Sequence, residues 1–187
     1  MKWLLLLTLL CSQSLFASQL SDLSFLYYKD QAQNIAHDKS FDNPGQCNPQ
    51  SMSCLRATCS RLSPSNCDDD YEIKKVIDMC KGGVSGDCVF NSTKRMSPSN
   101  VDDIYEMEKI VNECKSNIGG SCIDVYITRL SESSVDDSYE VTKYLKKCSG
   151  ISNDVADCAS FTCSRLSASS CDDDYEIDRI IKTCSNL

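Results

Sequence analysis

Residues 54–80 read CLRATCSRLSPSNCDDDYEIKKVIDMC, and three later stretches of the chain repeat this pattern. The repeats begin at Cys54, Cys88, Cys122 and Cys158, which are 34, 34 and 36 residues apart. Each repeat has an arginine, an Asp-Asp pair, a Tyr-Glu pair and a closing cysteine at matching positions. A period of 34 residues is typical of helix–turn–helix units that stack into a solenoid.

The second half of each repeat predicts an amphipathic helix. In the first repeat its apolar residues fall at positions i, i+3, i+4 and i+7, which places them on one helical face: Ile73, Val76, Ile77 and Cys80. An aspartate with a glutamate three residues later precedes each apolar stripe, as in a capping box: Asp69, Asp103, Asp137 and Asp173.

The first half of each repeat fits a shorter helix that ends at the Arg-Leu-Ser or Arg-Met-Ser sequence. The Ser-Pro-Ser-Asn link at 63–66 predicts a tight turn, because proline presets φ and serine and asparagine bond their own backbone. Short links make neighbouring helices antiparallel. We therefore predict an all-α fold: a solenoid-like array of four disulfide-stapled αα-hairpins with an N-terminal capping helix. The predicted repeats span about 51–85, 86–119, 120–155 and 156–187.

The N-terminus predicts export. Residues 1–17, MKWLLLLTLLCSQSLFA, combine one lysine, a short apolar run and small residues at the end, as a signal peptide does. We expect residues 18–50 to form an extension with one helix that covers the open face of the first repeat. Downstream, no apolar segment of 18 residues predicts a membrane span. The expected location is secreted or periplasmic.

The composition argues against several classes of function. A net charge of −8 and a pI near 4.6 argue against nucleic-acid partners, which require clustered lysine and arginine. Histidine is the usual side chain for acid–base catalysis at neutral pH and a common zinc ligand, and the chain has one histidine, His37. We predict no catalytic, cofactor-binding or metal-binding residue, and not an enzyme. The Asp-Asp-Asp stretches at 68–70 and 172–174 suit helix capping, with a weak cation-binding surface as the alternative.

The cysteines predict a disulfide framework, since 13 remain after the signal peptide takes Cys11. One cysteine starts the first helix of each repeat and one ends the second, and those ends lie side by side in a hairpin. The predicted bridges within hairpins are Cys54–Cys80, Cys88–Cys114, Cys122–Cys148 and Cys158–Cys184. Two more pairs occur only in the first and last repeats and predict bridges across the turns: Cys59–Cys67 and Cys163–Cys171.

A second register is compatible with the spacing. It joins successive repeats through Cys47–Cys54, Cys80–Cys88, Cys114–Cys122 and Cys148–Cys158. Loop-closure entropy favours the bridges within hairpins, because they enclose more residues, by roughly 1 kcal/mol each. The first register leaves Cys47 unpaired and the second leaves Cys184 unpaired. Cys47 is thus a candidate for an intermolecular disulfide, including one that links a homodimer.

Helical hairpins with C-x25-C inside the unit and C-x7-C between most units resemble the exported, cysteine-rich Sel1-like repeat proteins of bacteria. The resemblance covers residues 54–184 and rests on cysteine spacing and helix order, while the Gly-rich turn signature of Sel1-like repeats is absent. It implies a TPR-like helical array with disulfides. Some members bind or slowly process β-lactam-like ligands, which makes a hydrolase or β-lactam-binding activity the alternative function.

Two repeated columns are candidates for an interaction surface: Tyr71, Tyr105, Tyr139 and Tyr175, and Arg61, Arg95, Arg129 and Arg165. The tyrosines either form a contact ladder on the solvent side or pack against the first helix of their repeat. The arginines either line a groove or tie the end of the first helix to the acidic start of the second. The predicted function is an exported, disulfide-stabilised helical-repeat scaffold that binds a protein partner.

Overall fold

The computed structural model describes residue 29 and residues 49–67, 69–115 and 120–186 of the chain. Regular structure in these residues is helical throughout, with no strand. The longer helices are α2 (Pro49–Cys59), α3 (Asp70–Cys80), α4 (Gly86–Thr93), α6 (Ile104–Cys114), α7 (Ser121–Arg129), α8 (Ser138–Lys147), α9 (Asn153–Arg165) and α10 (Asp174–Cys184). Short helical turns join them in pairs: η1 (Pro64–Cys67), α5 (Pro98–Val101), η2 (Glu132–Ser134) and η3 (Ala168–Ser170).

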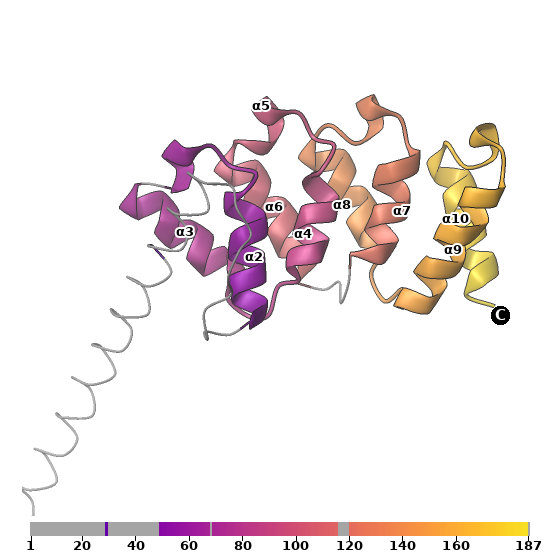
Figure 1. Cartoon of the computed structure of the whole chain (residues 1–187), viewed down its shortest axis with the longest axis horizontal. Coiled ribbons are helices and arrows are strands. Elements are labelled where there is room, and N and C mark those ends of the chain that lie inside the picture. Colours follow the sequence, from indigo (N-terminus) through magenta and orange to yellow (C-terminus); the bar gives the residue numbers. More distant parts are fainter. Residues whose placement is uncertain (1–28, 30–48, 68, 116–119, 187) are drawn as a thin grey trace, which may run out of the picture.

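The helices form an array of four hairpins, α2/α3, α4/α6, α7/α8 and α9/α10, as the repeat predicts. The first helices of the hairpins pack one against the next, from α2 through α4 and α7 to α9. Among the second helices, α6 lies between α3 and α8, whereas α10 packs against α9 and α7. In Figure 1 the short turns lie along one edge of the array, called here the turn edge, and the links between hairpins lie along the opposite edge, the junction edge.

The predicted helix caps are confirmed. The Asp69 carboxylate accepts the Tyr71 N–H at 2.8 Å, and the Asp103 carboxylate accepts the Tyr105 N–H at 2.7 Å. In the third and fourth repeats, Asp137 and Asp173 accept the N–H groups of Glu140 and Glu176. The apolar stripe that follows each cap is buried against the first helix of the hairpin, which is why the capped segment stays helical.

The disulfides follow the register within hairpins. The structure bonds Cys54–Cys80, Cys88–Cys114, Cys122–Cys148 and Cys158–Cys184, with Cα–Cα distances of 5.6, 5.8, 5.7 and 5.9 Å. A fifth bridge, Cys163–Cys171, crosses the turn of the last hairpin. The alternative register across the junctions is therefore not the one adopted. All four bridges within hairpins lie toward the junction edge, because each joins the first helix to the C-terminal end of the second, where the second helix meets that edge.

The remaining predicted bridge, Cys59–Cys67, stays a prediction. The structure leaves this pair unbonded, with both residues buried and their Sγ atoms 2.6 Å apart. This separation is shorter than the contact distance of two non-bonded sulfur atoms, so the pair is positioned for a bridge across the turn of the first hairpin.

The predictions for the N-terminal part fall outside the described residues: the signal peptide at 1–17, most of the extension at 18–50, His37 and Cys47. Before α2, the one described residue is Lys29, which is helical and forms an ion pair with Asp70 at the start of α3. Among the described helices, none is both long and apolar enough to cross a lipid bilayer.

Removing the bridge of the third hairpin with C122A/C148A is expected to lower the free energy of unfolding by about 2–4 kcal/mol, because the unfolded chain regains the freedom of the closed loop. Equilibrium urea unfolding measures the change. The control is E132Q, an exposed position in the turn of the same hairpin, for which we expect a change below about 0.5 kcal/mol. Equal changes in both variants would contradict a stabilising role of the bridge.

Candidate functional site

The four tyrosines of the repeated Tyr-Glu pair form an exposed row, called here the tyrosine row. Their exposed fractions are 71% for Tyr71, 62% for Tyr105, 76% for Tyr139 and 68% for Tyr175. The alternative of packing against the first helix is therefore wrong. Each tyrosine stands two residues before the buried stripe, and two helical steps rotate a side chain by about 200°. That rotation turns the ring away from the core, so the first alternative, a ladder on the solvent side, describes the row.

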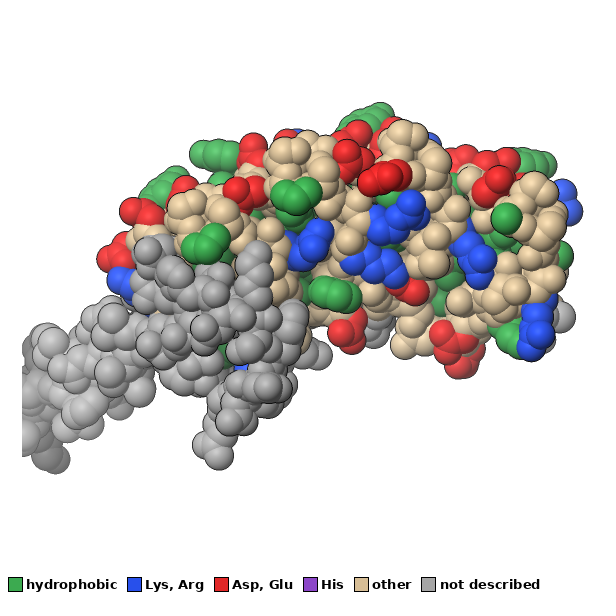
Figure 2. Space-filling view, turned by 45° about the horizontal axis from the view of Figure 1, so that its top comes forward, with side chains coloured by type: hydrophobic (Ala, Val, Ile, Leu, Met, Phe, Trp, Pro, Cys, Tyr) green, Lys and Arg blue, Asp and Glu red, His purple; other side chains and the backbone are tan. Residues whose placement is uncertain are grey.

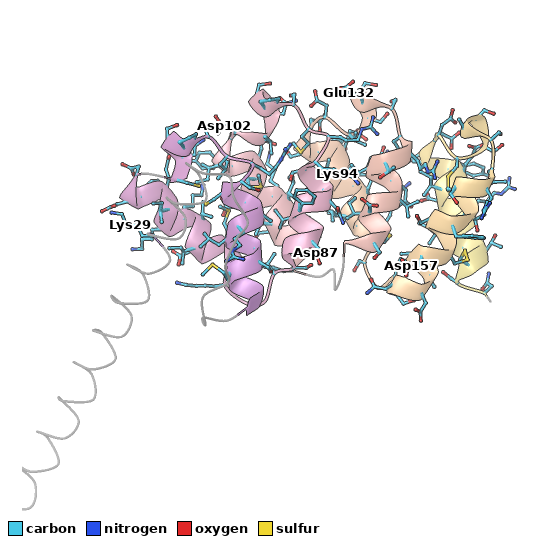
Figure 3. The ribbon with its side chains drawn as sticks, viewed as in Figure 1. Lys29, Asp87, Lys94, Asp102, Glu132 and Asp157 are labelled. Atoms are coloured by element: carbon cyan, nitrogen blue, oxygen red, sulfur yellow. A yellow bond between two sulfur atoms is a disulfide. The ribbon has the colours of Figure 1, made fainter. Side chains whose placement is uncertain are left out.

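The row lies on the turn edge, because each tyrosine is in the first turn of its helix. Exposed carboxylates accompany it: the capping residues Asp69, Asp103, Asp137 and Asp173 are all exposed. Figure 2 shows acidic and hydrophobic side chains gathered along this edge, while most lysine and arginine side chains lie lower on the same face. Figure 3 labels Asp102 and Glu132 on this edge, and Asp87 and Asp157 on the opposite one.

One ring of the row already binds a cation. The Lys75 ammonium of the first repeat lies 3.4 Å from the centre of the Tyr105 ring in the second repeat, and it also pairs with Glu108 at 3.1 Å. Beside this contact, a groove of about 410 Å³ between α3 and α6 has Met79 in its lining and Tyr71 at its wall. Over the other three rings of the row, the described residues place no cation.

The arginine column connects repeats instead of lining a groove. Arg95 of the second repeat donates from Nη1 to the carbonyls of Ile127 and Leu130, at 2.6 and 2.7 Å, at the end of α7. Arg61 of the first repeat makes the same contacts one repeat earlier, to the carbonyls of Thr93 and Met96 at 2.6 and 3.3 Å. The predicted tie to the acidic start of the second helix in the same repeat is therefore wrong. Helix C-termini leave carbonyls without intrahelical donors, and these are the groups that the guanidinium groups satisfy.

Arg129 and Arg165 do not extend this pattern in the described part of the chain. Arg129 has no such contact to the fourth repeat, and Arg165 is exposed, with its guanidinium 5.1 Å from the centre of the Phe161 ring. Among the described residues, Arg165 donates to no carbonyl of another repeat. The arginines therefore do not form one surface with the tyrosines.

In the second and third repeats, the first aspartate of the Asp-Asp pair also connects repeats. The Asp102 carboxylate accepts the Ser63 N–H, and the Asn66 side chain donates to the Asp102 carbonyl at 2.6 Å. The Ser97 N–H and the Asn100 side chain hold Asp136 in the same way. In these two repeats, the first aspartate binds the turn of the preceding repeat and the second caps its own helix.

Two glycines, whose role the sequence analysis missed, permit the close packing of the first helices. A Cβ atom at Gly86 would lie 2.5 Å from the Ser53 backbone, and one at Gly120 would lie 2.7 Å from the Asp87 carbonyl oxygen. They occupy the same repeat position, two residues before the first cysteine of their repeats. The fourth repeat has Ala156 there, after the longer spacing of 36 residues. This difference was a readable signal that the last junction is built differently.

The junction between the third and fourth repeats uses a cluster of tyrosine, lysine and aspartate side chains. The buried Tyr126 hydroxyl donates to the Asp178 carboxylate, and its ring stacks on Tyr144 with centroids 5.1 Å apart. The Lys147 ammonium donates to Asp174 at 2.9 Å and to Asp178 at 2.8 Å. This cluster joins α10 to α7 and α8 where the arginine and aspartate contacts stop.

The ionisation of this cluster favours a stable ion-pair network over proton transfer. Burial raises the pKa of the Tyr126 phenol, and its hydrogen bond to Asp178 acts in the same direction. For Lys147, burial opposes the charged form, but hydrogen bonds to Asp178 and Asp174 outweigh it and raise the pKa. General acid–base catalysts work best with a pKa near the working pH, and both shifts move away from neutrality.

A second group of carboxylates lies at the start of α10. Asp172, Asp173 and Glu176 bring oxygens within 4.8 Å of one another, two of the residues being exposed. Asp173 uses its carboxylate as the helix cap, so capping accounts for the position of that residue. The other predicted acidic stretch includes Asp68, which is outside the described residues.

Comparison with protein-family models, with curated proteins and with solved structures found no match for this chain.

Replacing Arg95 with alanine is expected to lower the free energy of unfolding by about 1–3 kcal/mol, because two carbonyls at the end of α7 lose their donor. Urea unfolding followed by circular dichroism measures this. The matched control is R165A, at the same repeat position but exposed and without a carbonyl contact to another repeat in the described part of the chain, with an expected change below about 0.5 kcal/mol. Similar losses in both variants would contradict a stabilising contact between repeats.

Acid should weaken the junction at Asp136. The Ser97 N–H lowers the pKa of this carboxyl, and the Ser97 hydroxyl and the Asn100 amide act in the same direction. A carboxyl whose pKa is lower in the folded state stabilises the fold above its unfolded value, about 3.9, and that contribution is lost as pH falls through the folded value. We expect D136N to have a lower Tm at neutral pH and a smaller decrease in Tm between about pH 5 and 2. Parallel Tm profiles of D136N, the exposed control E132Q and the unsubstituted chain would contradict this role.

Proposed function

We propose that the chain is an exported, disulfide-stabilised helical-repeat scaffold that binds a protein partner through the tyrosine row. The main observation in support is that all four tyrosines, which occupy one repeated position, are between 62% and 76% exposed. Tyrosine is enriched at protein interfaces because its rigid ring adds contact area and its hydroxyl finds a hydrogen bond. Capping and burial explain the neighbouring repeated positions, whereas neither accounts for an exposed ring in every repeat.

The disulfides support the same proposal. Five bridges in 187 residues fit an oxidising compartment such as the periplasm or the exterior of the cell. Bridges that restrict the hairpins also lower the entropy that binding would cost, because the surface is already ordered. The resemblance to exported Sel1-like proteins belongs to this proposal as well. A scaffold of this kind performs no reaction itself and holds its partner in place.

Photo-crosslinking in the native host tests the proposal. The photoreactive residue benzoylphenylalanine is placed at Tyr105 or at Tyr139, which we expect to give a covalent adduct with the same partner protein from both positions. The control places it at Asp157, which is exposed on the junction edge. We expect no adduct there, because the partner covers the opposite edge. Absence of adducts at the tyrosine positions, or the same adduct from position 157, would overturn the proposal.

A further inference from the structure

Each step of the tyrosine row offers the two groups that bind a guanidinium: an aromatic face and a carboxylate oxygen. Beside Tyr71, Tyr105 and Tyr139 stand the capping residues Asp69, Asp103 and Asp137. Each of these aspartates uses Oδ1 for the cap. In the described residues, their Oδ2 atoms have no donor. A cation over the ring therefore has an acceptor next to it.

The molecule itself shows that a ring of the row accepts a cation. Lys75 reaches across a junction to lie 3.4 Å from the Tyr105 ring centre, although Glu108 already provides a carboxylate partner at 3.1 Å. Tyr71 and Tyr139 have no equivalent cation among the described residues. The net charge of −8 attracts a basic partner over longer range as well. The negative charge of the chain and the rings and carboxylates of the row therefore favour a partner that presents arginine side chains.

The spacing of the row sets the spacing of the partner's arginines. Because α3, α6 and α8 pack side by side, consecutive tyrosines of the first three repeats are separated by one helix-to-helix distance, roughly 8–10 Å. A segment in the extended polyproline II conformation advances about 3.1 Å per residue with three residues per turn, so side chains three residues apart lie on one face and cover that distance. The row Tyr71–Tyr105–Tyr139 matches an arginine at every third residue. Tyr175 lies outside this register, since α10 packs against α9 and α7 instead of continuing the row of second helices.

We propose that the tyrosine row binds an extended basic segment of its protein partner, with the pattern Arg-x-x-Arg-x-x-Arg, across the first three repeats. This inference rests on the proposed function and specifies the chemistry of the partner. Each arginine stacks on one ring and donates to the aspartate beside it. The Tyr105 ring receives its arginine on the face that Lys75 leaves open.

Fluorescence anisotropy with the full chain tests the inference. The probe is a labelled peptide of ten residues with arginine at positions 2, 5 and 8 and serine or alanine elsewhere. A second peptide has the same composition with its three arginines adjacent. We expect the spaced peptide to bind at least about fivefold more tightly, and binding to weaken as salt shortens the Debye length. Equal affinity for the two peptides would overturn the inference.

Variants of the full chain distinguish the contribution of the tyrosine rings to binding from that of the aspartate carboxylates. Y71S/Y139S should weaken binding of the spaced peptide about tenfold, whereas Y71F/Y139F, which keeps the rings, should stay within about twofold. D69N/D137N should weaken binding as well while preserving the helices, because asparagine caps as well as aspartate does. F161S removes an exposed ring outside the row and should change nothing. Unchanged affinity in Y71S/Y139S would overturn the inference.

The experiments can contradict the arginine pattern without contradicting the proposed function. A partner that crosslinks to Tyr105 and Tyr139, together with no preference for the spaced peptide, would leave the proposed function standing and remove only the arginine pattern. Preference for the spaced peptide that depends on both rings supports the inference on its own.

Discussion

Contacts between the turn of one repeat and the following repeat determine how the hairpins stack. At the first two junctions, an arginine binds the carbonyls at the end of the next first helix, and an aspartate of the next repeat binds the preceding turn. These groups are partly buried, and a buried polar group without a partner is costly. The hairpins can therefore stack in one register only. That register aligns the tyrosines, which make none of these contacts themselves.

Covalent and non-covalent contacts fix opposite edges of the array. The bridges within hairpins lie toward the junction edge, where each joins a first helix to the C-terminal end of a second one. At the turn edge, the arginine and aspartate contacts join one hairpin to the next. Helices of 8–13 residues bury too little surface to be stable alone, so each hairpin depends on both kinds of contact. The turn edge thus gains order without a disulfide across each junction, and its outer face stays free for other contacts.

Local signals explain which parts of the fold could be predicted from the sequence. The second helices were predictable because the stripe at Ile73, Val76 and Ile77 and the cap at Asp69 depend on neighbours within one turn. The disulfide register within hairpins followed from helix order. The contacts of the arginines could not be predicted in this way, since an arginine at the same position of every repeat is equally compatible with a partner in its own repeat or in the next. Exposure of the tyrosines was readable from the sequence too, because a position two residues before the stripe lies about 200° around the helix from it.

The positions at which the repeats differ in sequence indicate which junction between repeats is built differently. Asparagine occupies the fourth turn position only at Asn66 and Asn100, the two repeats followed by a spacing of 34 residues. Where the spacing is 36, Ser134 stands there, Ala156 replaces the glycine, and Tyr126 and Lys147 bind Asp178 instead. The third junction is therefore a different interface, with its own polar cluster, and the fourth tyrosine is carried on a helix packed differently from the first three. A partner that recognises the row by its spacing therefore meets three equivalent positions, at Tyr71, Tyr105 and Tyr139.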